Sequence, residues 1–168
     1  AIFSRLLKEK MEEGKTYTSS FKDIESGKWY SNPIAYLESF KIISGYEDGT
    51  FKPDKKLTRA EFASVIARFA KLDTTKKTSF SDVSGEHWAK DYIDNAISHD
   101  WMGGYPDGTF KPNQPITRAE IVTVINKLIN RVPDKAAIDA DSANETKFKD
   151  LQKTYWAYYD VIEASSNR

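Results

Sequence analysis

The sequence predicts an all-α protein made of repeated helix–loop–helix units. Segments 21–69 and 80–128 align at a constant offset of 59 residues without a gap, and 19 of the 49 aligned positions are identical. Each segment contains the sequence Asp-Gly-Thr-Phe-Lys-Pro, at 48–53 and 107–112, which is typical of a tight turn followed by a short extended stretch. A capping signal and apolar residues with helical spacing follow each loop, so the repeated unit is helix, structured loop, helix.

The helix after each loop is predicted to begin at a capping box. In Thr58-x-x-Glu61 and Thr117-x-x-Glu120 the threonine side chain can cap the helix while the glutamate reaches back to it. Apolar residues then recur at i, i+3, i+4 and i+7, the stripe of a helix that faces a core. These residues are Phe62, Val65, Ile66 and Phe69 in the first unit and Ile121, Val124, Ile125 and Leu128 in the second.

A shorter helix is predicted before each loop. Each unit opens with Phe-x-Asp, at 21–23 and 80–82, and a tryptophan follows the aspartate by six residues. In the first unit Asn32-Pro33 starts the helix, because proline is favoured at the first helical position. In the second unit the apolar residues again have helical spacing: Tyr92, Ile93, Ala96 and Ile97.

Partial copies of the unit flank the two complete ones. The chain divides into a second half at 1–14, complete units at 21–72 and 80–131, and a first half at 148–166. The N-terminal half rests on Ile2, Phe3 and Leu6, and the polar segments 73–79 and 133–147 are predicted to be linkers. We expect the terminal halves to pair into a third unit, which gives one compact domain with a pseudo-threefold arrangement. The alternative is a truncated array in which a neighbouring chain supplies the missing half by swapping.

Composition excludes several classes of protein. The 168 residues include 25 basic and 25 acidic side chains, so the chain lacks the basic surface from which non-specific nucleic-acid binders draw their affinity. Because there is no cysteine, disulfides, thiolate metal sites and thiol nucleophiles are excluded. No apolar run approaches the roughly 20 residues that span a bilayer, so membrane insertion is not expected. The chain begins at Ala1 without a signal peptide, and we interpret it as a mature fragment.

The repeated blocks resemble the S-layer homology (SLH) motif. In that motif an opening Phe-x-Asp and a tryptophan lead through a GY-x-DGTF-x-P loop, here 45–53 and 104–112, to Thr-Arg-Ala-Glu. The resemblance covers the whole chain apart from the linkers and implies a three-pronged helical domain. It further implies a secreted module on the bacterial cell surface that binds secondary cell-wall polysaccharide, often pyruvylated, in grooves between units. Self-association through the split unit is a further expectation.

Carried over position by position, the resemblance implies two ligand-contacting arginines, Arg59 and Arg118. The opening of the next unit and the two loops complete the predicted grooves with Asp82, Trp88, Asp150, Trp156, Gly45, Tyr46, Gly104 and Tyr105. A cation in the first turn of a helix is mildly disfavoured by the helix dipole, by up to about 1 kcal/mol. Beside free backbone N–H groups, however, a guanidinium suits a carboxylate ligand. The alternative is a salt bridge to a nearby acidic residue.

Structural interpretations exist for the other predicted site residues. Trp88 and Trp156, with Trp29 at the same repeat position, are interpreted first as buried anchors between units and second as platforms for a sugar ring. Gly45 and Gly104 permit either a positive φ or the close approach of a ligand. The two loop tyrosines can pack while presenting a hydroxyl group. Trp101 lies outside the repeat position and is expected to pack in the core.

Catalysis is not expected. The two histidines, His87 and His99, lie in one unit without counterparts in the other, and no nucleophile elbow, zinc-protease motif or phosphate loop is present. The Asp-Gly loops lack the alternating oxygen ligands of an EF-hand, so no metal is predicted, and no cofactor is implied. A protein-interaction module for surface-layer assembly is the alternative to polysaccharide anchoring, and a saccharide requirement separates the two.

Overall fold

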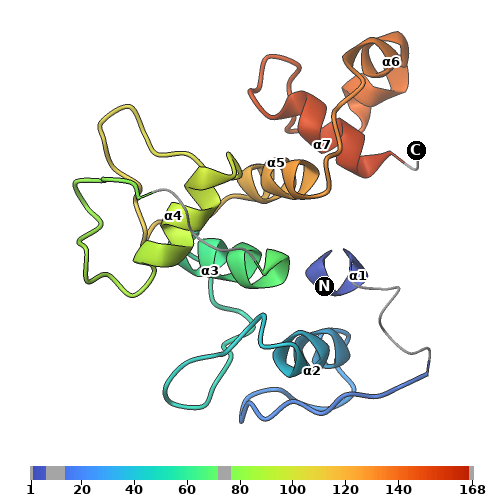
Figure 1. Cartoon of the computed structure of the whole chain (residues 1–168). Helices are drawn as coiled ribbons and strands as arrows, with labels where there is room; N and C mark the ends of the chain where they lie inside the picture. The colour runs from blue at the N-terminus through green and yellow to red at the C-terminus, as the bar shows by residue number, and fades with distance from the viewer. Residues whose placement is uncertain (1, 7–13, 72–76, 167–168) are drawn as a thin grey trace.

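The computed structural model consists of short helices joined by structured loops (Figure 1). It describes residues 2–6, 14–71 and 77–166, apart from the side chains of residues 2, 145 and 146. The α-helices are α1 (Ile2–Leu6), α2 (Ser31–Ser39), α3 (Arg59–Ala70), α4 (Lys90–Ser98), α5 (Arg118–Leu128), α6 (Lys135–Ala140) and α7 (Tyr158–Ser165), and η2 (Ser142–Thr146) is a 3₁₀ helix. Within the described residues, β pairing is confined to two isolated bridges, Thr58 with Pro115 and Phe80 with Val83. The predicted all-α class of repeated helix–loop–helix units is confirmed.

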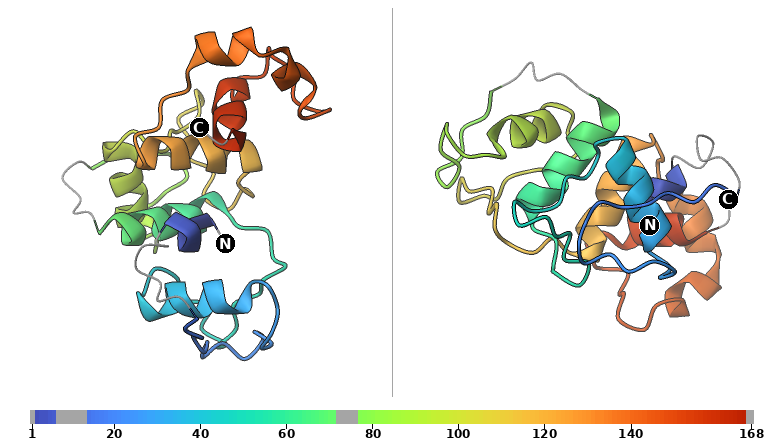
Figure 2. Two further views of the ribbon diagram at one scale, coloured as in Figure 1. Left: turned by 90° about the vertical axis from the view of Figure 1, so that its right-hand side faces the viewer. Right: turned by 90° about the horizontal axis from the view of Figure 1, so that it is seen from below.

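The helices pack as three pairs, and each pair joins two different units. The pairs are α1 with α2, α3 with α4, and α5 with α7. In each pair the second helix of one unit meets the first helix of the next, so a unit completes its packing only with its neighbour. Figure 1 and the left view of Figure 2 show α2 at one end of the molecule, α6 and α7 at the other, and α3 with α4 between them.

The predicted apolar stripes form the main core. Phe62 and Ile66 of α3 are buried, and Val124 and Ile125 of α5 belong to the same cluster. Phe3 of α1 joins this cluster, with its ring centroid 6.0 Å from that of Phe62 and 5.1 Å from that of Phe69. Trp101 is half-buried against the same cluster, as predicted.

Both predicted capping boxes are present. The side chains of Thr58 and Thr117 accept hydrogen bonds from the backbone N–H groups of Glu61 and Glu120, each at 3.2 Å. The carboxylates of these glutamates accept the threonine N–H groups in return, each at 2.8 Å. Each box leaves the second carboxylate oxygen of its glutamate available for other partners, and these partners differ between the units.

The prediction of a linker over 133–147 is wrong, because this segment contains α6 and η2. Asp134 caps α6 by accepting the N–H of Ala137 at 3.0 Å. Ile138 of α6 is 1% exposed and forms a second apolar cluster with Tyr158 and Ile162 of α7. The helix was missed because a single apolar side chain carries its packing, so the sequence has no stripe. The other predicted linker, 73–79, lies partly outside the described residues.

The segment before each complete unit is held by a carboxylate on that unit's first helix. Asp94 is fully buried and accepts hydrogen bonds from the Thr78 N–H at 2.9 Å and from Lys90 Nζ at 2.5 Å. Glu38 binds the segment before the first unit in the same way, through Ser19 Oγ at 2.6 Å and the Ser20 N–H at 3.2 Å.

Burial disfavours ionisation of Asp94 and Glu38, but these hydrogen bonds outweigh it and hold both pKa values below their usual range. In the C-terminal half-unit Tyr158 and Ile162 stand at the positions of Lys90 and Asp94. The polar contact is replaced there by the apolar contact with α6.

The expected pairing of the terminal half-units, 1–14 with 148–166, stays a prediction. In the structure α1 packs against α2, and α7 packs against α5 and α6. The buried residues of α1 and α7 also belong to different apolar clusters, represented by Phe3 and Ile162.

Candidate functional site

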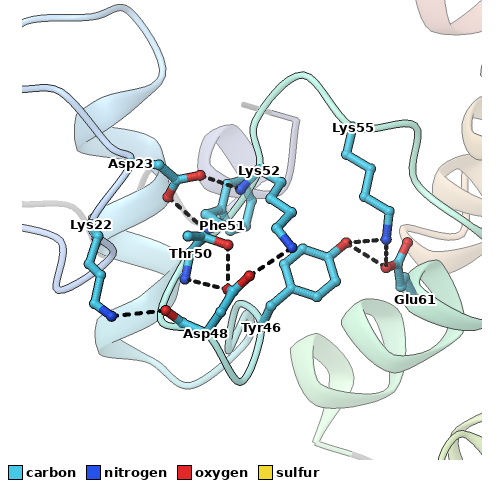
Figure 3. Close-up of polar contacts among 9 residues, drawn as sticks. All are labelled: Lys22, Asp23, Tyr46, Asp48, Thr50, Phe51, Lys52, Lys55 and Glu61. Carbon is cyan, nitrogen blue, oxygen red and sulfur yellow. Dashed lines mark hydrogen bonds and ion pairs between the residues drawn. The ribbon is translucent and has the colours of Figure 1, made fainter.

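The loop of each unit is built on its opening aspartate. Asp23 accepts the N–H groups of Phe51 and Lys52 at 2.8 and 2.7 Å (Figure 3). Hydrogen bonds led by that from the Phe51 N–H lower the pKa of Asp23 below its usual value. In the second unit Asp82 accepts the N–H groups of Phe110 and Lys111, each at 2.8 Å. The structure therefore gives Asp82, a predicted ligand contact, a role in shaping the loop.

The two loop glycines are needed for packing. A Cβ atom at Gly45 would overlap the ring of Phe21, and one at Gly104 would overlap the ring of Phe80. Gly45 also has a φ of +64°, whereas Gly104 is not among the glycines with positive φ. The explanation by positive φ therefore holds for Gly45 alone, and close approach of the opening phenylalanine explains both.

In the first unit the loop tyrosine is bound by residues of its own unit. Tyr46 donates to Glu61 Oε1 at 2.6 Å and accepts from Lys55 Nζ at 2.8 Å (Figure 3). Lys52 and Lys55 lie 4.6 and 4.4 Å from the centroid of its ring. Burial disfavours ionisation of Glu61, but hydrogen bonds from Tyr46, the Thr58 N–H and Lys55 outweigh it and lower the pKa of Glu61. The contact between Lys55 and Glu61 is open to solvent, because the Lys55 side chain is 47% exposed.

In the second unit the equivalent position is filled by Arg59 of the first unit. Arg59 Nη1 pairs with Glu120 Oε1 at 2.6 Å, and its guanidinium carbon lies 4.9 Å from the ring centroid of Tyr105. Its Nε and Nη2 donate to the carbonyl oxygens of Phe110 at 2.9 Å and Gly103 at 2.7 Å. Only 5% of the side chain is exposed. Of the two interpretations of Arg59, the salt bridge is the one that the structure shows, whereas ligand contact stays a prediction.

Backbone hydrogen bonds complete this junction between the units. The N–H groups of Arg59 and Ala60, at the start of α3, donate to the carbonyl oxygens of Gln114 and Pro112 at 2.9 and 3.0 Å. The N–H of Ile116 donates back to the Leu57 carbonyl at 2.9 Å. The helix N-terminus that would otherwise offer free donors to an anion is therefore occupied by the second unit.

Arg118, the matching arginine of the second unit, differs from Arg59 in its surroundings. It is exposed, and within the described part of the chain its guanidinium forms no hydrogen bond or ion pair. The N–H groups of Arg118 and Ala119 likewise meet no acceptor among the described residues, in contrast to their counterparts Arg59 and Ala60. A guanidinium and two backbone donors at one helix start can receive a carboxylate.

The tryptophans of the repeat position are exposed, so their interpretation as buried anchors is wrong. Trp29, Trp88 and Trp156 are 77%, 58% and 60% exposed. The buried residue at this place is the following alanine, Ala89 or Ala157, which is fully buried. The alanine therefore takes the buried place, and the adjacent indole lies largely in solvent.

Other aromatic rings accompany the exposed tryptophans. The ring of Trp88 stacks on His87 at 5.8 Å and lies 6.5 Å from Tyr92, while Trp156 lies 5.7 Å from Tyr155. Asp150 is also exposed in the opening of the C-terminal half-unit. Flat apolar faces beside polar groups are suited to sugar rings.

Sequence reasoning missed two basic residues, one within the first unit and one at its junction with the second. Lys55 contacts Tyr46 and Glu61, and the signal was the unlike pair Lys55 and Gln114 at one repeat position. Arg68 of α3 contacts Tyr92 in the first turn of α4. The sequence signal for Arg68 was that the matching position of the second unit also carries a basic residue, Lys127. In the described ranges no group of three acidic or histidine side chains is placed to hold a metal ion, and no helix is long and apolar enough to cross a membrane.

Comparisons with known proteins decide the family. The model of the S-layer homology domain matches residues 20–63 and 79–122, which together make up more than half of the chain. The chain belongs to the S-layer homology family. Its two matched segments begin one residue before the opening phenylalanine of each unit and end within α3 and α5.

Two named relatives align over nearly the whole chain, and a third aligns over a shorter part. The cellulosome-anchoring protein of Acetivibrio thermocellus is 38% identical over 169 residues, 96% of this chain and 36% of that protein. Cell surface glycoprotein 1 of the same organism is 35% identical over 98% of this chain and 7% of its own length. The surface layer protein of Brevibacillus choshinensis is 35% identical over 60% of this chain and 9% of its own length. This SLH chain thus spans about a third or less of these relatives.

Proposed function

We propose that this chain is a non-catalytic module that holds a surface protein non-covalently on an acidic or pyruvylated secondary cell-wall polymer of a bacterium. Support comes from the family and from relatives whose names describe anchoring, cell-surface and surface-layer proteins. In this proposal the module works outside the cell, on the cell wall. Any catalytic activity belongs to other parts of the parent protein.

The observation that carries the proposal is the repeated exposure of one tryptophan. Trp29, Trp88 and Trp156 each lie just before the first helix of a unit and are more than half exposed. An exposed indole lacks the apolar contacts that a core would provide, and the same repeat position is exposed in all three copies. An indole face receives the apolar face of a sugar ring, so a polymer can rest on several such platforms.

The second junction, between α5 and α7, supplies a site for an acidic sugar. The exposed guanidinium of Arg118 and the N–H groups at the start of α5, which have no acceptor among the described residues, would bind the carboxylate. Trp156 would receive the ring, and the exposed carboxylate of Asp150 would accept hydrogen bonds from sugar hydroxyl groups. These three side chains come from the set carried over from the family.

The first junction is shaped by the remaining predicted residues. Trp88 is its sugar platform, while Arg59 and Asp82 fix the position of the second unit's loop through the contacts described above. Gly45 and Gly104 keep the loops packed on their opening phenylalanines. Tyr46 and Tyr105 sit between cationic side chains at the edges of the loops. In our proposal these six residues hold the binding surface in place.

Two modest sites on one chain would bind one polymer more strongly than either site alone. Once one site is occupied, the second meets its sugar at a high effective concentration, provided the polymer reaches both. The proposal therefore predicts that polymer of many repeats binds more tightly per chain than a single repeat does.

Calorimetric titration of the chain with purified secondary cell-wall polymer tests the proposal, using polymer before and after chemical removal of its acidic ketals. Binding to the intact polymer that is lost with the ketals is the expected result. Equal binding to both forms contradicts the recognition of an acidic sugar. No binding to either form contradicts anchoring and favours the alternative, a module for surface-layer assembly, which sedimentation of the chain alone would reveal as concentration-dependent self-association.

A further inference from the structure

The first junction contains a second arginine, Arg68, whose position differs from that of Arg59. Its Nη1 donates to Ser44 Oγ at 3.0 Å, and its Nη2 donates to the Tyr92 hydroxyl at 3.0 Å. Ser44 directly precedes the loop of the first unit, whereas Tyr92 belongs to α4 of the second. Arg68, which lies on α3, therefore links both units at the junction.

No acidic side chain among the described residues compensates the positive charge of Arg68. Within the described residues its hydrogen-bond partners are the two neutral hydroxyl groups of Ser44 and Tyr92, and it takes part in no salt bridge. The three hydrogen bonds use three of the five N–H donors of the guanidinium, which leaves two for a ligand. Arg59 differs, because it is buried and paired with Glu120.

An aromatic platform adjoins this cation. The guanidinium carbon of Arg68 lies 4.9 Å from the ring centroid of Tyr92, and that centroid lies 6.5 Å from that of Trp88. Trp88 is 58% exposed, and Ser44 is exposed as well. One surface thus offers an indole face for the apolar side of a sugar, two hydroxyl groups and a cation for a carboxylate.

We propose that Arg68 contacts the carboxylate of the acidic sugar at the first junction, with Ser44 and Tyr92 orienting its guanidinium and Trp88 receiving the sugar ring. This inference rests on the proposed function and deepens it. Arg59 then acts as a positioning residue that holds the second unit's loop. Because Arg59 is buried and paired with Glu120, Arg68 supplies the positive charge for the ligand.

The site is not repeated at the second junction. Lys127 stands at the position of Arg68, and its Nζ donates to the Asp100 carbonyl at 2.8 Å. The counterpart of Tyr92 is Asp160, which accepts from Asn126 Nδ2 at 3.0 Å and places a negative charge where the first junction has a phenol. The two junctions therefore use different cations, Arg68 at the first and Arg118 at the second.

The test is a calorimetric titration with two small probes, a methyl glycoside that carries a pyruvyl ketal and the neutral methyl ester of the same compound. It uses the Arg118→Gln variant, so that only the first junction retains its cation. This variant should bind the acid at least tenfold more tightly than the ester. Adding Arg68→Gln should weaken binding of the acid about 10- to 100-fold and bring the acid-to-ester ratio near one, as expected for the loss of a charge-assisted contact.

Matched variants separate recognition from folding. Adding Lys127→Gln instead of Arg68→Gln should leave the acid-to-ester ratio unchanged, because Lys127 lies outside the site. Arg68→Lys keeps the charge without the fork and should bind the acid with intermediate affinity. An acid-to-ester ratio that survives Arg68→Gln overturns this inference and leaves the proposed function standing. If the wild-type chain binds neither the probes nor the wall polymer, the proposed function fails and the inference fails with it.

Discussion

The two TRAE blocks have identical sequences, Thr58–Glu61 and Thr117–Glu120, but their arginines differ in environment. Arg59 is 4% exposed and held by the second unit's loop, whereas Arg118 is exposed and unpaired within the described residues. The difference arises because the acceptors of this arginine belong to the next unit and not to its own. A repeated motif therefore fixes the residue and its helix but not its partners. One arginine position thus carries a structural contact in the first unit, whereas in the second unit no described residue contacts its guanidinium.

The glutamates of the two blocks also differ in the partners of their carboxylates. Glu120 Oε1 receives Arg59, and Glu61 Oε1 receives Tyr46 and Lys55 of its own unit. Lys55 thus contacts the glutamate of the first unit's block in the way that Arg59 contacts the glutamate of the second unit's block. The first arrangement is local and solvent-exposed, whereas the second joins two units in a buried position, where the loss of one partner costs more free energy.

Replacing the two arginines separately should give the largest contrast. Arg59→Ala removes one partner of a buried ion pair and two carbonyl contacts, so it should lower the free energy of unfolding by about 3–5 kcal/mol. Arg118→Ala should change it by no more than about 0.5 kcal/mol, as is usual for an exposed side chain, because no described residue contacts its guanidinium. Urea denaturation followed by circular dichroism measures both. Similar losses for the two variants would contradict the assignment of different roles.

The glutamates should differ in the same direction but by less. Glutamine can still close a capping box, so Glu120→Gln isolates the contact with Arg59 and should cost about 1.5–3 kcal/mol. Glu61→Gln should cost less than about 1 kcal/mol, because its cationic partner Lys55 is 47% exposed and well screened. Thermal unfolding of both variants checks this order, and a larger loss for Glu61→Gln would reverse the comparison.

Acid should weaken the contacts by which Asp94 of α4 and Glu38 of α2 hold the segments before their units. The pKa values of Asp94 and Glu38 are lowered in the folded state, so the unfolded chain binds more protons as the pH falls through the ordinary carboxyl range near 4. Stability should therefore be full above that range and decline towards the lower folded pKa values. Urea unfolding between pH 7 and pH 3 should show this decline, and it should be shallower in Asp94→Asn. An unchanged slope in the variant would exclude Asp94 as a source of acid sensitivity.

Exchanging the exposed tryptophans should have the smallest effect on stability. Trp29→Phe and Trp156→Phe should each change the free energy of unfolding by less than about 0.5 kcal/mol, because both indoles lie largely in solvent. The half-buried Trp101 provides the control, since Trp101→Phe removes contacts with the main core. Acrylamide should also quench Trp29 and Trp156 more than Trp101 in variants that retain one tryptophan. Equal quenching would contradict the exposure on which the anchoring proposal rests.

Much of the fold could be predicted because its signals are local. The capping boxes and the apolar stripes of α3 and α5 each lie within about a dozen residues of sequence. The start of α2 was predicted less well, because the helix begins at Ser31 and Pro33 is its third residue. Helix α6 could not be predicted, because its packing depends on Ile138 and on apolar residues of α7 that lie some twenty positions later. The pairing of each helix with the next unit's first helix is equally non-local, and the repeat alone did not reveal it.

The candidate site was predictable in its residues but not in their roles. The motif identified Arg59 and Arg118 together, since an alignment treats equivalent positions as equal. Burial depends on which neighbour is present, and the loop of the second unit covers Arg59 while nothing in the described residues covers Arg118. The tryptophans were misplaced for a related reason. The size and hydrophobicity of tryptophan suggest a core position, but after Trp88 and Trp156 it is the following alanine that is buried.

The most direct test of the two arginine roles is a nuclear magnetic resonance measurement of the guanidinium Nε–H groups of Arg59 and Arg118. The structure predicts slow solvent exchange for Arg59, whose Nε donates to the Phe110 carbonyl at 2.9 Å, and fast exchange for Arg118. On addition of the ketal-bearing glycoside, the Arg118 signal should shift and the Arg59 signal should stay in place. Fast exchange at Arg59, together with a ligand-induced shift of its signal, would contradict the account and return this arginine to the binding surface.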